Sequence, residues 1–227
     1  MTGRRDELYG RRKGKPLSPR RAGLMATFFR DRVIDLAQPV PAAIGNLFPH
    51  SPERVALEIG FGAGEHLVAN ALAYPDAGFI GVEPYLNGMA TAVAAIHDQG
   101  LANIRLFDGD AARLLDWLPA TSLEGVDLLY PDPWPKKRHW KRRFVSPDNL
   151  DRLARVLKPG GTFCFASDIE SYVEWTLSHL TRHPDFEWTA ERADDWRKPF
   201  PGWPGTRYEA KALREGRRPT YLAFRRR

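Results

Sequence analysis

The hydrophobic positions of this chain alternate between short apolar runs and longer segments with helical spacing. A short apolar run without helical spacing is typical of a strand that is buried on both faces of a parallel sheet. Alternation of such strands with helices predicts an α/β fold with a mostly parallel sheet. The predicted strands are 55–59, 78–82, 103–107, 126–130 and 162–166, and the predicted helices are 24–36, 65–73, 86–99, 147–157 and 170–180.

Two further apolar runs, 186–189 and 221–224, are candidates for a final antiparallel pair. Residues 194–219 between them predict a long loop, and so long a loop in a compact domain is usually functional or disordered. Residues 1–21 carry many cations and almost nothing apolar, which predicts a flexible arm that either solubilises the protein or orders on nucleic acid. We therefore expect one folded domain, 22–227, after this basic arm.

The composition indicates a folded protein with a polyanionic partner. The chain has 227 residues, of which 43% are hydrophobic and 27% charged, and this excludes disorder of the whole chain. A formal net charge of +6 and a pI near 9.6 favour nucleic acid as the partner. Cys164 is the only cysteine, which excludes an internal disulfide and fits a reducing compartment. No secretion signal and no apolar run long enough for a membrane span is found, so we expect a cytoplasmic protein.

A glycine-rich turn joins the first predicted strand to the helix after it. Its glycines, Gly60, Gly62 and Gly64, allow positive φ and let a ligand approach the backbone. The spacing is G-x-G-x-G and not the dinucleotide fingerprint G-x-G-x-x-G, and Glu65 opens the helix where a pyrophosphate would need free N–H groups. The turn therefore argues against NAD, and a purely structural tight turn is the alternative.

Acidic residues stand at the ends of successive predicted strands: Glu58, Glu83, Asp110 and Asp132. Because the carboxyl ends of parallel strands meet at one edge of a sheet, we expect these acids to line one crevice. Glu83 is placed to accept hydrogen bonds from ribose hydroxyls, whereas Glu58 lies within an apolar run and must have a partner. A dinuclear metal site is the alternative, but no histidine joins the set, so no metal is expected.

An acidic turn and a dense basic run follow the predicted strand 126–130. Asp132 lies between Pro131 and Pro133, whose fixed φ angles stiffen the turn and hold its carboxylate in place. The basic run that follows also contains histidine and tryptophan, a composition suited to phosphate contacts with an aromatic ring for stacking. A solvated surface loop is the alternative, but the position at the carboxyl end of a strand favours a ligand site.

Taken together, these segments resemble class I AdoMet-dependent methyltransferases, and more closely the bacterial tRNA (guanine-N7-)-methyltransferase family. The resemblance spans roughly residues 20–227 and rests on LEIGFGAGEH, PDPWPKKRHWKRRF, LKPGG, ASDIESYVEW and TRYEAKALREGRRPTYLAFRR. The glycine loop and LKPGG are common to many methyltransferases, whereas the PDPW block and the TRYE stretch are specific. The resemblance implies a Rossmann-like seven-stranded sheet, mostly parallel with a C-terminal antiparallel strand and helices on both faces.

The resemblance also implies the residues of the site. The expected cofactor-binding residues are Glu58, Gly60, Gly62, Gly64, Glu83, Asp110 and Asp132, with Asp132 also the catalytic residue. The expected substrate-binding residues are Lys136, Asp168, Thr206, Arg207, Tyr208 and Glu209, and the expected RNA-binding residues are Arg138, His139, Trp140, Lys141, Arg142 and Arg143. The cofactor would be S-adenosyl-L-methionine (AdoMet) and the substrate N7 of a guanine in tRNA, at position 46 of the variable loop.

Other functions fit parts of the sequence. A methyltransferase could act on another RNA, on a small metabolite or on a protein, although the last two leave the basic loop unexplained. A non-catalytic nucleic-acid-binding module on a Rossmann-like scaffold is a further alternative. Against it, carboxylates beside a polyanion site hinder binding unless they hold something else. The sequence indicates no obligate protein partner, and it leaves open the choice between monomer and homodimer and the set of tRNAs.

Overall fold

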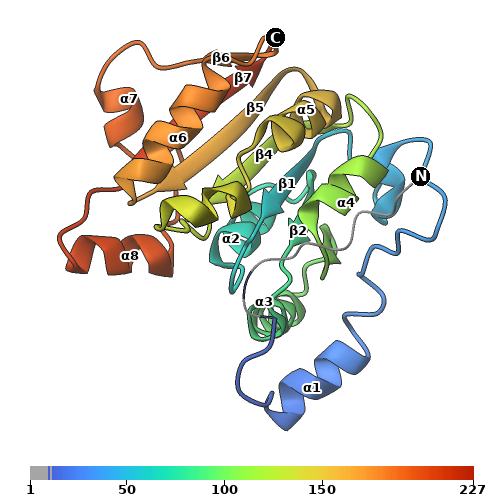
Figure 1. Ribbon diagram of the computed structural model, residues 1–227. Helices are drawn as coiled ribbons and strands as arrows, with labels where there is room; N and C mark the ends of the chain where they lie inside the picture. Colours follow the sequence, from blue (N-terminus) through green and yellow to red (C-terminus); the bar gives the residue numbers. More distant parts are fainter. Residues whose placement is uncertain (1–9, 11) are drawn as a thin grey trace.

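The computed structural model describes residue 10 and residues 12–227, which form a mostly parallel sheet with helices around it (Figure 1). Within these residues seven strands form one sheet in the order β3-β2-β1-β4-β5-β7-β6. β7 runs antiparallel to both of its neighbours, and the other pairs are parallel. The strands are β1 Val55–Ile59, β2 Gly78–Val82, β3 Ile104–Phe107, β4 Leu123–Leu129, β5 Leu157–Ser167, β6 Phe186–Trp188 and β7 Thr220–Arg226. The expected α/β fold is thus confirmed.

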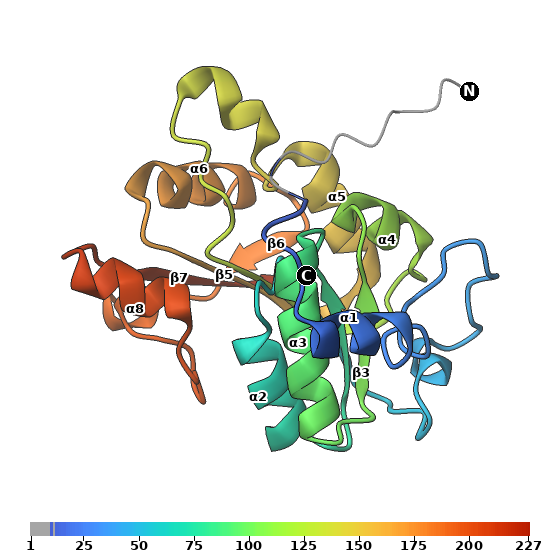
Figure 2. The same ribbon diagram turned by 90° about the horizontal axis from the view of Figure 1, so that it is seen from below.

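Helices cover both faces of the sheet, with α2 and α3 on one face and α4, α5 and α6 on the other (Figure 2). The α-helices are α1 Pro19–Ala26, α2 Glu65–Ala73, α3 Leu86–Asp98, α4 Ala111–Trp117, α5 Pro147–Val156, α6 Glu170–Leu180, α7 Asp194–Arg197 and α8 Arg207–Arg214. Two 3-10 helices are η1 Ile44–Leu47 and η2 Lys137–Arg142.

Apolar side chains fill the space between the sheet and the helices on each face. On one face Leu67 of α2 and Met89 of α3 are buried in a cluster that includes side chains of β2 and β3. On the other face Leu153 of α5 packs with Phe163 and Phe224 of the sheet. Each such burial stabilises the fold by roughly 1.5–3 kcal/mol. Burial on both faces is the reason that the strands read as continuous apolar runs.

The strand order reverses between β1 and β4. From β1 the chain continues outward to β2 and β3, and it then returns to β4 on the other side of β1, where Glu58 is paired in register with Asp127. Because the connections leave in opposite directions at this point, a crevice opens at the carboxyl ends of these two strands. The topology thus indicates a binding site at this edge before any side chain is considered.

The helix expected over residues 24–36 is wrong. α1 ends at Ala26, and Val33 forms a parallel bridge with Leu106 of β3. The amide of Ile34 donates to the carbonyl of Leu106 at 2.8 Å, and the amide of Leu106 donates to the carbonyl of Arg32 at 2.9 Å. These bonds cover the free edge of β3, a tertiary interaction that outweighs the local helical spacing.

The long loop expected over residues 194–219 contains two helices, α7 and α8. Thr206 is the N-cap of α8, where its side-chain oxygen accepts a hydrogen bond from the amide of Glu209 at 3.1 Å. Strand β5 also begins earlier than expected, at Leu157 instead of residue 162. The tryptophans, prolines and glycines of residues 194–219 hide the helical pattern in the sequence. In the structure the N-cap Thr206 stabilises the helix α8.

The N-terminal segment contacts the body of the protein. The predicted domain boundary at residue 21 falls inside α1. Before it, the amide of Gly14 donates to Oδ1 of Asn87 at 2.7 Å, and the carbonyl of Arg12 accepts from the amide of Leu86 at 2.9 Å. Of the flexible arm predicted over residues 1–21, residues 1–9 and 11 lie outside the described residues. Among the described helices, none combines the length and the hydrophobicity of a membrane span.

We expect Gly88→Ala to destabilise the protein. A Cβ on Gly88 would lie 2.4 Å from the carbonyl oxygen of Gly62, a backbone atom that cannot move without displacing the glycine loop. Such overpacking typically costs about 1–3 kcal/mol. The matched control is Gly23→Ala in α1, where a Cβ would meet nothing within 4 Å and should be neutral or slightly stabilising. Denaturant unfolding checks this, and equal free energies of unfolding for both variants would contradict it.

Candidate active site

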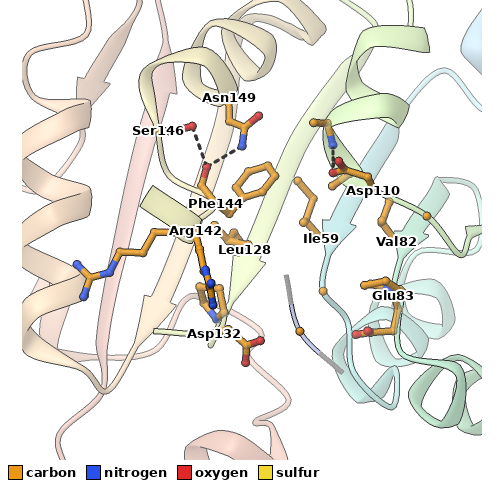
Figure 3. A pocket seen from close by; sticks show the side chains of 18 of the residues that line it. Ile59, Val82, Glu83, Asp110, Leu128, Asp132, Arg142, Phe144, Ser146 and Asn149 are labelled. Atoms are coloured by element: carbon orange, nitrogen blue, oxygen red, sulfur yellow. Dashed lines mark hydrogen bonds between the residues drawn. The ribbon is translucent and has the colours of Figure 1, made fainter. Parts of the chain in front are cut away.

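A hollow of about 1460 Å³ opens at the carboxyl ends of β1, β2 and β4 (Figure 3). Its walls include Ile59, Glu83, Asp110, Asp132 and Phe144, which come from segments far apart in the sequence. Figure 3 shows Glu83 and Asp110 on one side of the hollow and Asp132 on the other, with Ile59 of β1 between them. The hollow therefore lies where the sheet topology predicts a binding site.

The glycine loop brings backbone atoms to the surface of the hollow. Gly60 and Gly62 line it with φ angles of 73° and 61°, in the left-handed region that residues with a Cβ rarely adopt. Gly64 begins α2 and is not among the lining residues. A ligand in the hollow can thus approach the main chain between β1 and α2 directly.

Glu83 connects the glycine loop to the start of α3. Its Oε2 accepts a hydrogen bond from the amide of Gly62, and its Oε1 accepts one from the amide of Tyr85, both at 2.8 Å. Burial raises the pKa of Glu83, and the two backbone hydrogen bonds oppose this shift. Each carboxylate oxygen has a second lone pair, so Glu83 can still accept a hydrogen bond from a ligand.

Asp110 is held at the rim of the hollow by its role in α4. It is the N-cap of this helix, and its Oδ1 accepts a hydrogen bond from the amide of Ala112 at 2.9 Å (Figure 3). The cap fixes the orientation of the carboxylate, and lone pairs remain for a donor on a ligand. The side chain therefore has both a structural role and a place on the hollow.

Asp132 lies at the mouth of the hollow on a strained loop. Tyr130 and Trp134, on either side of it, have φ angles of 49° and 45°. Residues with a Cβ adopt this region at a cost of roughly 1–3 kcal/mol, and such strain clusters at active sites. Asp132 keeps much of its surface in solvent, yet partial desolvation raises its pKa. The geometry favours a functional role for this carboxylate.

The expectation that four acids line one crevice holds for three of them. Glu58 is only 5% exposed and is not among the lining residues. Its Oε2 lies 3.0 Å from Nδ1 of His66 on α2, which supplies the partner that the sequence predicted. Glu58 thus lies behind the glycine loop, and its direct contact with a cofactor stays a prediction.

Glu58 belongs to a buried polar cluster that sequence analysis missed. Its register partner on β4 is Asp127, an acid at the start of an apolar run. Burial raises the pKa of Asp127 to about 6, and Glu58 adds to this rise while His66 opposes it. Burial lowers the pKa of His66, but the hydrogen bond and charge of Glu58 and the charge of Asp127 outweigh it and raise that pKa. The imidazole of His66 and the two acids therefore interact electrostatically inside the cluster.

The segment 206–209, expected to bind substrate, lies against the glycine loop and α2. Tyr208 lines the hollow, and a Cβ on Gly62 would lie 3.3 Å from its ring. Arg207 forms an ion pair with Glu65 at the start of α2. The structure therefore brings part of the predicted substrate segment to the predicted cofactor loop.

Two acids expected to bind substrate are already engaged by other side chains. Glu209 is buried, and its carboxylate accepts hydrogen bonds from the indole N–H of Trp203 at 2.7 Å and from the hydroxyl of Tyr221. Asp168 forms an ion pair with Arg217. Neither acid is among the residues that line the hollow.

The basic loop presents exposed cations next to the hollow. Lys136, Arg138 and Lys141 are exposed, and Lys141 lines the edge of the hollow. His139 and Trp140 are partly buried, with Trp140 in edge contact with Trp175 of α6. Exposed cations close to Asp132 are suited to phosphate contacts.

Arg142 and Arg143, adjacent in the sequence, have different surroundings. Arg142 lies over the ring of Trp134 and lines the hollow. Arg143 is only 2% exposed and donates hydrogen bonds to Pro133 and Ser171. Arg143 also lines the hollow, but its guanidinium nitrogens all donate within the protein, so the RNA contact expected for it stays a prediction. The charge of the run is visible in the sequence, but the side on which each cation lies is not.

Several lining residues carry no signal in the sequence. Arg12, Tyr85, Phe144 and Asn149 all line the hollow. Asn149 is fixed by the hydrogen bond from its Nδ2 to the carbonyl of Phe144 at 2.8 Å (Figure 3). These residues belong to different elements, and only the convergence of those elements at one sheet edge identifies them.

Solved methyltransferases share this fold. The structure of the 16S rRNA methyltransferase KamB matches with a TM-score of 0.60 at 18% identity, over 83% of this chain and 95% of that chain. The structure of TrmN from Thermus thermophilus matches with a TM-score of 0.55 at 16% identity, over 78% of this chain and 45% of that chain. At these identities the likeness shows the fold, which is that of a Rossmann-like methyltransferase.

Sequence comparison then identifies the family. A family described as "Putative methyltransferase" matches residues 52–222. The tRNA (guanine-N(7)-)-methyltransferase of Rhizobium meliloti (strain 1021) is 60% identical over 97% of this chain and 95% of its own length. That of Mesorhizobium japonicum is 57% identical over 96% of this chain and 94% of its own length. The chain belongs to the tRNA (guanine-N7-)-methyltransferase family, and the expected enzyme class is confirmed.

We expect Asp127 to make stability depend on pH. Its pKa in the folded protein is about 6, above the ordinary 3.8, so folding favours the protonated form. The resulting contribution to stability is complete below the ordinary value and is lost as the pH rises through about 6. Asp127→Asn removes this ionisation. The difference between the free energy of unfolding of the variant and that of the wild type should therefore shift in favour of the variant as the pH rises, by on the order of 2 kcal/mol.

Urea unfolding of both proteins at a pH of about 5 and of about 7.5 measures this effect. The control is Asp76→Asn, which changes an exposed acid outside the cluster. If the free energies of unfolding of Asp127→Asn and the wild type differ by the same amount at both pH values, Asp127 stays ionised in the folded protein over this pH range, and the prediction is wrong.

Proposed function

We propose that this chain transfers the methyl group of AdoMet to N7 of a guanine in tRNA, at position 46 of the variable loop. The observation that carries the proposal is the hollow, where Glu83, Asp110 and Asp132 converge beside the glycine loop in a chain of this family. We further propose that the enzyme acts in the cytoplasm, where it would meet its tRNA substrate.

The residues of the hollow suit AdoMet. Glu83 would accept hydrogen bonds from the ribose hydroxyls, and Asp110 would accept one from the adenine amine. Gly60 and Gly62 leave room for the ligand against the main chain, and the carboxylates of Glu83 and Asp132 would attract the sulfonium in a hollow whose lining also contains arginines. When bound, AdoMet supplies an electrophilic methyl group.

The chemistry asks little of the protein beyond position and charge. N7 of guanine has an in-plane lone pair and no proton, so its attack needs no general base. The reaction places a positive charge on the purine, and a fixed carboxylate nearby stabilises that charge in the transition state. Asp132, held at the mouth of the hollow, is the residue we assign to this role. Alignment of the reacting atoms by the surrounding walls lowers the barrier by several further kcal/mol.

We assign the guanine to the side of the hollow formed by Tyr208 and Asp132. The resemblance implies that Asp168 and Glu209 accept hydrogen bonds from N1–H and the exocyclic amine of guanine, a pattern that adenine does not offer; because neither acid lines the hollow, the base would have to reach past its wall to meet them. Discrimination of this kind amounts to about 1–3 kcal/mol per bidentate contact. The partners of the two acids, among them Arg217 and Trp203, would hold the carboxylates in fixed orientations. Lys136, Thr206 and Arg207 would complete the substrate side.

We expect Asp132→Ala to lower the single-turnover rate of methyl transfer by about 10²–10³-fold, because the developing charge on the purine loses its counterion. The measurement is the formation of N7-methylguanosine in tRNA, by mass analysis of the nucleosides, with AdoMet binding measured separately. The control is Asp76→Ala, which removes an exposed acid outside the hollow. An unchanged rate would remove Asp132 from the mechanism, and the absence of N7-methylguanosine with the wild type would overturn the function itself.

We expect Arg138→Ala and Lys141→Ala to weaken tRNA binding and to reduce its salt dependence. The slope of log K against log salt is negative, and each lost phosphate contact should make it less steep by roughly 0.7–0.9. Arg182→Ala, which removes an exposed arginine just after α6, is the control and should leave the slope unchanged. Titration of tRNA at several salt concentrations measures the slope. The same slope for all three variants would exclude the basic loop from the RNA interface.

A further inference from the structure

The loop that carries Asp132 cannot hold its own conformation. Pro131, Pro133 and Pro135 have no backbone N–H, so the loop has few donors for internal hydrogen bonds. Tyr130 and Trp134 have positive φ angles, a strained arrangement that persists only where the surrounding structure enforces it. The position of Asp132 must therefore be set by groups outside the loop.

Arg143 supplies such a group. Its Nε donates to the carbonyl of Pro133 at 2.9 Å, one residue after Asp132. Its terminal nitrogens donate to the carbonyl of Ser171 at 2.7 Å and to the hydroxyl of Ser171 at 3.1 Å. The planar guanidinium thus joins the loop to the first turn of α6, and α6 follows directly on Asp168. All three of its nitrogens are used for this purpose.

Aromatic rings hold the guanidinium in place. Its central carbon lies 4.5 Å from the ring centroid of Trp140, 4.7 Å from that of Tyr172 and 5.5 Å from that of Trp175. Burial lowers the pKa of Arg143, and among the described residues no carboxylate contributes to that shift. A buried cation without a counterion is costly. The hydrogen bonds and the cation–π contacts offset this cost only while the loop and α6 stay in their observed places.

We propose that Arg143 is a positioning residue for methyl transfer: it holds the loop of Asp132 against α6 and so fixes the catalytic carboxylate relative to the hollow. The inference rests on the proposed role of Asp132 but adds a residue that, although it lines the hollow, directs its guanidinium nitrogens to Pro133 and Ser171. It also separates Arg143 from the exposed cations of the basic loop. Lysine cannot replace it fully, because an ammonium group lacks the planar fork that reaches Pro133 and Ser171 together.

The test compares Arg143→Lys with Arg155→Lys. Arg155 also donates to backbone carbonyls, those of Leu115 and Leu118, but it joins α5 to α4 away from the loop. Arg143→Lys should lower the single-turnover rate at saturating tRNA and AdoMet about tenfold or more, since a displacement of about 1 Å can cost as much as 10²-fold. The Kd for tRNA should change by less than about twofold, with the same salt slope, because Arg143 contacts no phosphate. Arg155→Lys should leave the rate and the Kd unchanged.

Hydrogen exchange tests the position of the loop without any reference to activity. In Arg143→Lys the amides of Tyr130 and His139, which flank the loop and donate to the carbonyls of Ala166 and Lys136, should exchange faster, and in Arg155→Lys they should not. Ser171→Ala, which removes one acceptor and leaves the charge in place, should shift rate and exchange in the same direction by a smaller amount. It also covers the case in which Arg143→Lys does not fold.

Three outcomes are distinguishable. Faster exchange with a slower rate and an unchanged Kd supports the proposal. Faster exchange with an unchanged rate leaves Arg143 as the residue that holds the loop and contradicts the catalytic role of Asp132 instead. Unchanged exchange, or a weaker Kd with a smaller salt slope and a normal rate at saturation, would overturn the proposal and make Arg143 an RNA contact.

Discussion

The parallel pairing of β1 with β4 is the constraint on which the rest of the structure depends. The connections from these strands leave in opposite directions, so the loops at their carboxyl ends face each other across an open hollow. The glycine loop stands on one side and the loop of Asp132 on the other. The same register places Glu58 beside Asp127 inside the protein, where two acids repel each other. His66 offsets this repulsion.

The buried cluster also joins the two halves of the site. The ring of Trp203 lies 5.1 Å from that of His66, and its indole N–H donates to Glu209. Helix α2, which follows the glycine loop, is therefore in contact with the segment that leads into α8. Arg207 and Glu65 add an ion pair between the same two elements. The glycine loop and the segment that carries Tyr208 are thus positioned by shared side chains rather than independently.

Positive charge serves two purposes in the basic loop. Exposed cations such as Arg138 and Lys141 keep their charge in water, where it is available to a polyanion. The charge of Arg143 is buried, and there its guanidinium makes directed hydrogen bonds and contacts the aromatic rings around it. Composition counts these residues as equivalent, although the physical environment gives them opposite functions. A net charge therefore indicates a partner but does not identify the contacts.

The sequence by itself determined the sheet, the glycine loop and the carboxylates at the strand ends. Strands buried on both faces are mostly apolar, and a turn with positive φ angles favours glycine, so these features appear in the local pattern. Tertiary structure alone decided that residues 32–34 cover a strand edge instead of continuing a helix, that Glu58 is bound by His66, and that Arg143 lies inside. Each of these outcomes depends on partners supplied by segments far away in the chain. A local pattern records what a residue is able to do, but only the fold determines which partner it meets.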